Sequence, residues 1–239
     1  MKILGIIQAR MGSTRLPQKV FMDIGGRPML EIVLERLSQS KLVDEWVIAT
    51  TTNPRDDALV AFAQAHSALV FRGSEEDLTD RFYQCAKEHK ADVIVRATSD
   101  NPLVDGAFAD VAVREFLSSQ VDYAGATLGK TYPLGLNVEV FGFDGLEQAW
   151  REDKNPAWRE HVTPFFYMQP ERFACLGLTF ERDVHALRWT VDTPEDMAFA
   201  RAVFAHFGRW DFGWREALAA CEAHPEWGAI NAQIEQKKV

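Results

Sequence analysis

The stretch ILGIIQARMGSTRLPQKVFMDIGGRPMLEIVLERL, residues 3–37, decides the fold of this chain. It begins with the unbroken apolar run Ile3 to Ile7, which is typical of a β-strand buried on both faces of a sheet. Pro28 then opens a segment with apolar residues at helical spacing, and proline suits the first turn of a helix. The stretch therefore predicts a strand, a long polar loop and a helix in succession.

The same alternation continues along the chain. Strands are expected over residues 46–50, 68–71 and 93–97, and helices over 56–65, 78–86 and 108–117. Such β-α alternation predicts an α/β fold, with a mostly parallel sheet and helices on both faces. The 239 residues suffice for one large core, so we expect a single domain over residues 1–239.

The rhythm breaks after Tyr123. Residues 125–170 are rich in glycine, proline and aromatic side chains, with one strand expected over 138–143. We interpret this segment as an insertion, or arm, that lies over the sheet and contributes to a subunit contact. The α/β rhythm returns with a strand expected over 188–191 and a helix whose apolar face includes residues 200–207.

Composition argues against several classes of function. The formal net charge of -9 disfavours binding to nucleic acid or to an anionic membrane, although a few clustered cations can still bind a small anion. The three cysteines are far apart and form no C-x-x-C pair, which favours free thiols in a reducing compartment. No apolar run is long enough to span a bilayer, so we expect a soluble, cytoplasmic protein.

Cations and small residues fill the loop after the first strand, at the edge where open α/β sheets bind ligands. A triphosphate carries about four negative charges, which backbone N–H groups and several cations together can neutralise. A solvated basic loop is the alternative, and the glycine fingerprint of dinucleotide-binding proteins is absent. The loop residues that we single out are Arg10, Gly12, Ser13, Thr14, Arg15 and Lys19.

Two aspartates follow expected strands and are candidate metal ligands. Asp100 follows the strand over 93–97, and Asp192 follows the strand over 188–191. Two carboxylates at neighbouring strand ends can hold one hard cation, while phosphate oxygens and water complete its coordination. The alternatives are structural: Asp-Asn-Pro is common in turns, and Thr193-Pro194 resembles a helix N-cap followed by a proline.

A further set of polar residues lies beyond these strand ends. Arg72 follows the strand over 68–71 and faces the same edge of the sheet. Within the insertion, Glu139 is expected on a strand, and Arg159 and His161 near the start of a helix. A lone histidine is more often structural, but this one is flanked by both signs of charge. We therefore place a small anionic acceptor near these residues and Asn137.

Six segments, in this order, resemble the spore coat polysaccharide biosynthesis protein F family. They are IIQARMGSTRLPQKV, FRGSEEDLTDRF, IVRATSDNPLVD, YPLGLNVEVF, REHVTPF and TVDTPEDM. That family is part of the cytidylyltransferase superfamily, together with the CMP-sialic acid and CMP-Kdo synthetases. The resemblance extends from residue 3 to about residue 205. One departure is Gln18, where glycine is common in the family.

The resemblance implies a Rossmann-like nucleotidyltransferase fold, CTP as donor, Mg²⁺ as cofactor and a homodimer formed through the inserted arm. It implies Asp100 and Asp192 as metal ligands, and Arg15, Lys19 and Asp100 as catalytic residues. The sugar-acid ligands of the synthetases have no clear counterpart here, so the acceptor is not implied. The nucleotide-binding residues expected are Ala9, Arg10, Gly12, Ser13, Thr14, Arg15, Lys19, Arg72 and Thr98.

The resulting hypothesis is in-line attack by an acceptor oxygen on the α-phosphorus of CTP, with release of pyrophosphate. Three alternatives remain open. One is a nucleotidyltransferase that uses another nucleoside triphosphate on a sugar phosphate. Another is a nucleotide-sugar-dependent glycosyltransferase, although no D-x-D motif ends a predicted strand. The last is a nucleotide-binding module without catalytic activity.

Overall fold

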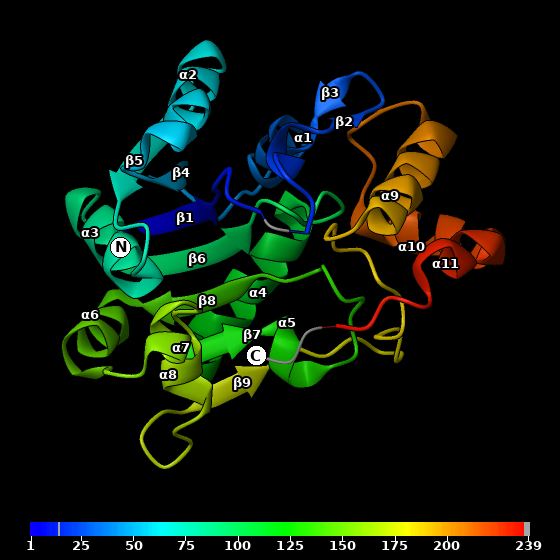
Figure 1. Cartoon of the computed structure of the whole chain (residues 1–239). Coiled ribbons are helices and arrows are strands. Elements are labelled where there is room, and N and C mark those ends of the chain that lie inside the picture. The colour runs from blue at the N-terminus through cyan, green and yellow to red at the C-terminus, as the bar shows by residue number, and fades with distance from the viewer. Residues whose placement is uncertain (14, 237–239) are drawn as a thin grey trace.

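A seven-stranded sheet forms the centre of the molecule, in the order β5-β4-β1-β6-β8-β7-β9 (Figure 1). The computed structural model describes residues 1–13 and 15–236. The four strands from β5 to β6 are parallel, as the alternation predicts. They are β1 (Ile3–Gln8), β4 (Glu45–Thr51), β5 (Leu69–Gly73) and β6 (Val93–Thr98).

Helices cover both faces of this sheet, and β1 alternates between the two cores. Ile3 and Ile7 pack into the core beneath α1 (Met29–Leu37), α2 (Asp57–Ala65) and α4 (Gly106–Ser119). Leu4 and Ile6 pack into the opposite core, beneath α3 (Leu78–Glu88). Burial of each such side chain contributes about 1.5–3 kcal/mol, so the apolar run is stable only between two layers.

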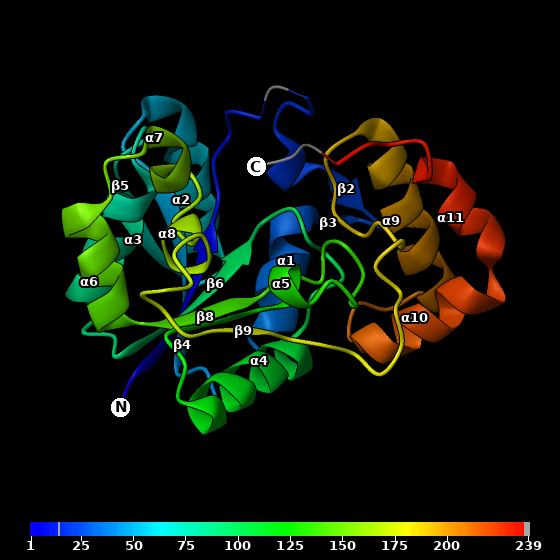
Figure 2. The same cartoon turned by 90° about the horizontal axis from the view of Figure 1, so that it is seen from below.

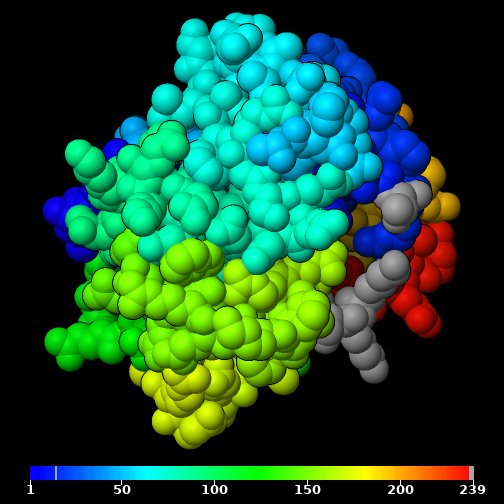
Figure 3. Space-filling model, turned by 60° about the vertical axis from the view of Figure 1, so that its left-hand side comes forward, coloured from blue at the N-terminus to red at the C-terminus, as the bar shows by residue number. Residues whose placement is uncertain are grey.

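Residues 125–170 belong to the sheet and its covering layer, which corrects the expectation of an arm over the sheet. β8 (Glu139–Gly142) pairs antiparallel with β6 and with β7 (Tyr123–Gly125), and β9 (Cys175–Gly177) forms the edge. The intervening helices are α5 (Ala126–Gly129), α6 (Phe143–Glu152), α7 (Pro156–Arg159) and α8 (Pro164–Tyr167). α6 and α8 contribute to the same core as α3, and in Figure 3 the surface of this segment adjoins that of the preceding helices.

Three helices pack together at the far end of the molecule from α3 and α6 (Figure 2). They are α9 (Pro194–Phe207), α10 (Trp214–Ala223) and α11 (Pro225–Asn231). The strand expected over residues 188–191 is wrong: Arg188 forms only an isolated bridge with Leu134 in the described part of the chain. The capping expectation is confirmed, because Thr193 and Asp196 form a reciprocal capping box at the start of α9.

Short elements connect the first strand to the first helix. A 3-10 turn, η1 (Lys19–Phe21), leads into a small hairpin of β2 (Asp23–Ile24) and β3 (Arg27–Pro28). The spacing predicts Pro28 in the first turn of the helix. In the structure Pro28 is instead the N-cap residue, and α1 begins at Met29. A second 3-10 turn, η2 (Pro54–Asp56), precedes α2.

A buried arginine ties the first helix to two distant loops. Arg36 of α1 donates hydrogen bonds of 2.7–3.1 Å to the carbonyls of Leu103, Val104, Trp210 and Phe212. Burial lowers the pKa of Arg36 to about 10, so the guanidinium remains charged at neutral pH. The loop after β6 and the connection between α9 and α10 are thereby held against the same helix.

In the described ranges of the chain, no helix combines the length and the apolar character that a bilayer crossing requires.

Candidate functional site

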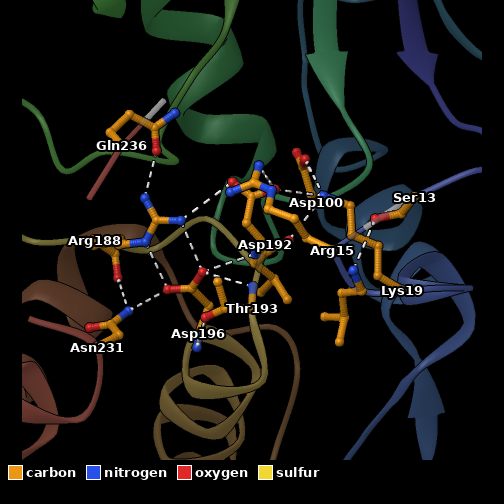
Figure 4. A network of polar contacts seen from close by, with 12 residues as sticks. Ser13, Arg15, Lys19, Asp100, Arg188, Asp192, Thr193, Asp196, Asn231 and Gln236 are labelled. Atoms are coloured by element: carbon orange, nitrogen blue, oxygen red, sulfur yellow. Dashed lines mark hydrogen bonds and ion pairs between the residues drawn. The ribbon is translucent and has the colours of Figure 1, made fainter. Parts of the chain in front are cut away.

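Three loops that are distant in sequence meet on the ammonium group of Lys19 (Figure 4). Its Nζ donates to Asp100 Oδ2 at 2.7 Å, to Asp192 Oδ1 at 2.9 Å and to the carbonyl of Val191 at 3.0 Å. The guanidinium of Arg15 lies 3.1 Å from the same Asp192 oxygen. The carboxyl ends of β1 and β6 face one edge of the sheet, which places the residues that follow them side by side.

The carboxylate of Asp100 is oriented by its own loop. Thr98 donates its hydroxyl to Asp100 Oδ1 at 2.5 Å, and Asn101 donates its amide to the Thr98 hydroxyl at 2.8 Å. Burial alone would raise the pKa of Asp100, but the charge of Lys19 and these hydrogen bonds lower it below the usual value. Thr98 therefore supports a carboxylate in this structure, and Asp100 is ionised at neutral pH.

The charge of Lys19 is similarly secure. Burial acts to lower the pKa of its ammonium group, and the two aspartates outweigh that effect and raise the pKa above its ordinary value. The backbone N–H of Val191 also donates to the carbonyl of Asp100 at 2.8 Å. This bond docks the segment before α9 onto the loop after β6, so the two carboxylates are held together even apart from Lys19.

The first residues of the loop after β1 are held by β4 and by η2. Ala9 continues the pairing with β4, since its N–H donates to the carbonyl of Ala49 at 3.2 Å. The N–H of Met11 donates to the buried carboxylate of Asp56 at 2.7 Å. Gln18 has a φ of 56°, in the left-handed region that favours glycine, so glycine would adopt this backbone conformation with less strain.

Three other loop residues expected to bind nucleotide differ in how they lie. Arg10 is 47% exposed and extends toward Glu160 at 3.9 Å, and the hydroxyl of Ser13 accepts from the N–H of Leu16 at 3.4 Å. At Gly12 a side chain would meet the guanidinium of Arg55 at 3.1 Å, so glycine provides room in a tight stretch. Thr14 lies outside the described residues.

Asp192 is also held from the side opposite Lys19 by residues that the sequence reasoning missed. Arg188 donates to Asp192 Oδ2 at 3.3 Å and pairs with both oxygens of Asp196 at 2.8 and 2.9 Å. The side-chain amide of Asn231, in α11, donates to Asp196 at 2.9 Å. The available signal was the spacing of Arg188, Asp192 and Asp196, each four residues from the next, with the helix cap Thr193 between the two aspartates.

The donor set fits a magnesium ion that is completed by its substrate. Among residues 1–13 and 15–236, no three His, Cys, Asp or Glu side chains are grouped to form an all-protein metal site. Asp100 and Asp192 instead converge from two loops on one cation, the Lys19 ammonium. Mg²⁺ is commonly bound by one or two carboxylates together with phosphate oxygens and water, so these two residues suit it.

Arg72 lies at the same edge of the sheet but is engaged within the protein. Its guanidinium donates to the carbonyls of Thr51 and Asn53 at 2.9 and 3.0 Å, and it lies 2.7 Å from Asp57. The Asp57 side chain is 63% exposed, so this ion pair is readily exchanged for another anion. Arg72 can therefore bind a nucleotide only after it leaves Asp57.

Glu139, expected to bind the acceptor, is buried within a polar network. Its carboxylate accepts from the hydroxyls of Tyr123 and Thr163 at 2.6 and 2.8 Å, and it forms a short ion pair with Arg96. Arg96 in turn donates to Gln8 at 3.0 Å. The sequence reasoning missed Arg96, which lies in the middle of a buried strand. Glu139 thus fixes a buried arginine and leaves little capacity for a ligand.

Arg159 is likewise used by the fold. Its guanidinium donates to Asp77 Oδ2 at 2.6 and 2.8 Å and to the carbonyls of Trp150 and Asp153 at 3.0 Å. It is the last residue of α7, not near the start of a helix as expected. The geometry therefore makes Arg159 a structural link between α7 and the N-terminus of α3, and its role as a ligand of the acceptor stays a prediction.

His161 and Asn137 remain available for an acceptor. Both are half-buried, and His161 follows Glu160, which reaches the loop after β1 through Arg10. Asn137 lies two residues before Glu139, the first residue of β8. Burial, and then the charge of Arg96, lower the pKa of His161, so the imidazole is neutral at pH 7 and can donate or accept a hydrogen bond.

Comparison with known proteins places this geometry in context. Residues 4–217 match the family model described as Cytidylyltransferase. The uncharacterized protein MJ1063 of Methanocaldococcus jannaschii is 41% identical, over 99% of this chain and 97% of that protein. The spore coat polysaccharide biosynthesis protein SpsF of Bacillus subtilis is 35% identical, over 94% of this chain and 95% of its own. A cytidylyltransferase structure from Leptospira borgpetersenii superimposes with a TM-score of 0.92 at 32% identity, over 100% of both chains.

Proposed function

The chain belongs to the cytidylyltransferase family of nucleotidyltransferase enzymes, and from this premise we propose that it transfers CMP from CTP to a small anionic acceptor, with Mg²⁺ bound by Asp100 and Asp192. The observation that carries the proposal is the convergence of these carboxylates with Lys19 and Arg15 at the end of β1. Positioning and charge neutralisation, rather than covalent chemistry, account for catalysis at such a site.

The balance of charge explains how the site is suited to a triphosphate and a divalent cation. Arg15, Lys19 and Arg188 together offset the charges of Asp100, Asp192 and Asp196 in the protein alone. When Arg15 and Lys19 turn to phosphate oxygens, the three carboxylates retain only Arg188. The remaining excess of about two negative charges favours one divalent cation.

The roles of the protein groups follow from this exchange. Lys19 and Arg15 neutralise the charge that develops on the departing pyrophosphate, and Arg10 and the backbone of residues 9–13 hold the rest of the triphosphate. When bound, Mg²⁺ supplies Lewis-acid neutralisation of the phosphate oxygens. An acceptor that is already ionised, such as a carboxylate or a phosphate monoester, requires no general base.

We place the acceptor beside His161 and Asn137, where Arg10 connects this region to the nucleotide loop. The name of the Bacillus relative supports a role in the synthesis of a surface polysaccharide or glycoconjugate. The three free cysteines agree with a cytoplasmic location. We also expect a homodimer, which light scattering of the purified protein would test.

The decisive experiment measures pyrophosphate release with Mg²⁺ from CTP, UTP, GTP and ATP. Each nucleotide is paired with a panel of acidic sugars and phosphate monoesters. Release that depends on both CTP and one acceptor class supports the proposal. Faster release with another nucleotide would favour a sugar-phosphate nucleotidyltransferase of different specificity. Binding of CTP without release, across an acceptor panel and under several metal ions, would favour a non-catalytic module.

A further inference from the structure

We infer that Arg188 positions the Asp192 carboxylate for metal binding and that α11 fixes Arg188 through Asn231. This inference rests on the proposed function, because it concerns the same metal site. Of the cations near Asp192, Lys19 and Arg15 lie on the side of the triphosphate loop. Arg188 lies on the opposite side, away from that loop (Figure 4). Only Arg188 therefore keeps its contact when the other two turn to phosphate.

The distances show that Arg188 pairs more closely with Asp196 than with Asp192. Of its contacts with carboxylates, the two at 2.8 and 2.9 Å go to the fully buried Asp196, whereas its contact with Asp192 Oδ2 is 3.3 Å. A paired, two-point contact of guanidinium with carboxylate is geometrically specific. The charge of Arg188 is thus mainly offset by Asp196, and Asp192 Oδ1 remains directed at the position now taken by Lys19.

Asp196 also holds the backbone on which Asp192 is mounted. Its Oδ2 accepts from the N–H groups of Asp192 and Thr193, both at 3.0 Å. Arg188 and Asp196 therefore act on Asp192 twice, through its side chain and through its main chain. This is the arrangement by which groups outside the ligand set usually orient a metal ligand.

Two amide side chains, one at the end of α11 and one in the segment after it, contact Arg188. Asn231 is 2% exposed and donates to the Arg188 carbonyl at 3.0 Å and to Asp196 Oδ1 at 2.9 Å. Gln236 accepts from the Arg188 guanidinium at 2.5 Å. A cavity of about 360 Å³, lined by Leu134, Leu187, Phe199 and Ile234 among others, leaves apolar packing incomplete here. Trp227 and Ile230 of α11 still pack against the main core, whereas the polar contacts of Asn231 and Gln236 tie this segment to Arg188.

The test uses two variants. Arg188→Lys keeps the positive charge but cannot make the two-point contact of a guanidinium with Asp196. Asn231→Leu changes a residue that contacts neither of the proposed metal ligands. Binding of Mn²⁺ to the full-length enzyme with CTP, without acceptor, is followed by electron paramagnetic resonance. Both variants should bind Mn²⁺ on the order of tenfold more weakly. Affinity for CTP in EDTA should stay unchanged. Matched controls are Arg182→Lys, whose ion pair with Glu222 is about half exposed, and Gln233→Leu in the exposed segment after α11.

Two results would overturn the inference. In the first, both variants lower the thermal unfolding temperature but bind Mn²⁺ as tightly as the wild type, which would make the network purely structural. In the second, CTP affinity in EDTA falls as much as Mn²⁺ affinity does, which would place Arg188 in nucleotide binding. If Arg188→Lys does not fold, Asn231→Leu alone decides. Failure of the proposed function is recognised separately, because the wild type itself would then bind no CTP.

Discussion

Replacing Lys19 with methionine offers a direct test of the charge balance on which the site depends. The ammonium group donates to two carboxylates at 2.7 and 2.9 Å, and its side chain is 13% exposed. Loss of one partner of a fully buried ion pair costs about 3–5 kcal/mol. The side chains of Asp100 and Asp192 are 25% and 12% exposed, and Arg15 still faces Asp192, so a smaller loss of roughly 2–3 kcal/mol is expected.

For a chain of this length, that loss corresponds to a fall in Tm of about 4–12 °C in metal-free buffer. Without the ammonium, Asp100 loses its ion-pair partner while Asp192 keeps Arg15 and Arg188, so the two carboxylates are less neutralised and form a better site for a free divalent ion. Millimolar Mg²⁺ without nucleotide should therefore raise the Tm of Lys19→Met more than that of the wild type. An ion present at tenfold its Kd would add about 1.4 kcal/mol to stability.

The assay is differential scanning fluorimetry with and without Mg²⁺, followed by calorimetry with CTP. CTP affinity should fall sharply in Lys19→Met, because a cation in contact with the triphosphate is lost. The control is Lys154→Met, in which an ammonium that donates to the Arg151 carbonyl is removed from the exposed surface. Equal Tm values for Lys19→Met and the wild type, or equal responses to Mg²⁺ alone, would refute the reasoning.

Four further predictions concern single residues. Asp192→Asn should fold normally but lose most of its turnover at limiting Mg²⁺, and near-normal kcat would remove it from the ligand set. The pKa of Asp100 is lowered in the folded state, so this carboxylate stabilises the fold above about pH 4, and that stability is lost as the pH falls. In Asp100→Asn, the free energy of unfolding from urea titrations should therefore depend less on pH in the acidic range. Arg159→Ala should lower the free energy of unfolding by about 2–3 kcal/mol, because it breaks the ion pair with Asp77, and should leave the CTP affinity measured by calorimetry unchanged. A large loss of CTP affinity at unchanged stability would contradict this prediction. The pKa of His161 is lower in the folded state, so as the pH falls the unfolded state binds a proton at a higher pH than the folded state does. Stability should therefore decrease as the pH drops below about 6.5. The Tm of His161→Gln, measured over the same pH range, should decrease less.

Much of the parallel half of the sheet could be predicted from the sequence because its signals are local. The apolar run Ile3 to Ile7 and the helical spacing after Pro28 reflect the periods of a strand and a helix. The carboxyl ends of parallel strands share one edge, so Lys19 and Asp100 could be expected to meet there. The structure brings them within 2.7 Å.

Asp192 reaches the expected edge of the sheet, but not at the end of the strand that we expected. The strand expected over residues 188–191 does not form, yet Asp192 reaches the site because Val191 bonds to the carbonyl of Asp100. Backbone bonds between residues far apart in sequence, this one and those of Leu134 with Leu187, Trp189 and Thr190, hold the segment in place of the missing strand. No local pattern reports such a contact.

Only the tertiary structure decided which polar residues are free to bind a ligand. Glu139 and Arg159 carry the charges that an acceptor site would use, but Arg96 and Asp77 already occupy them. Whether a charge is free depends on partners that are 43 or 82 residues distant in the chain. The energy of such pairs comes from burial and geometry, which arise when the layers pack together, whereas the periods of strands and helices are set by neighbouring residues alone.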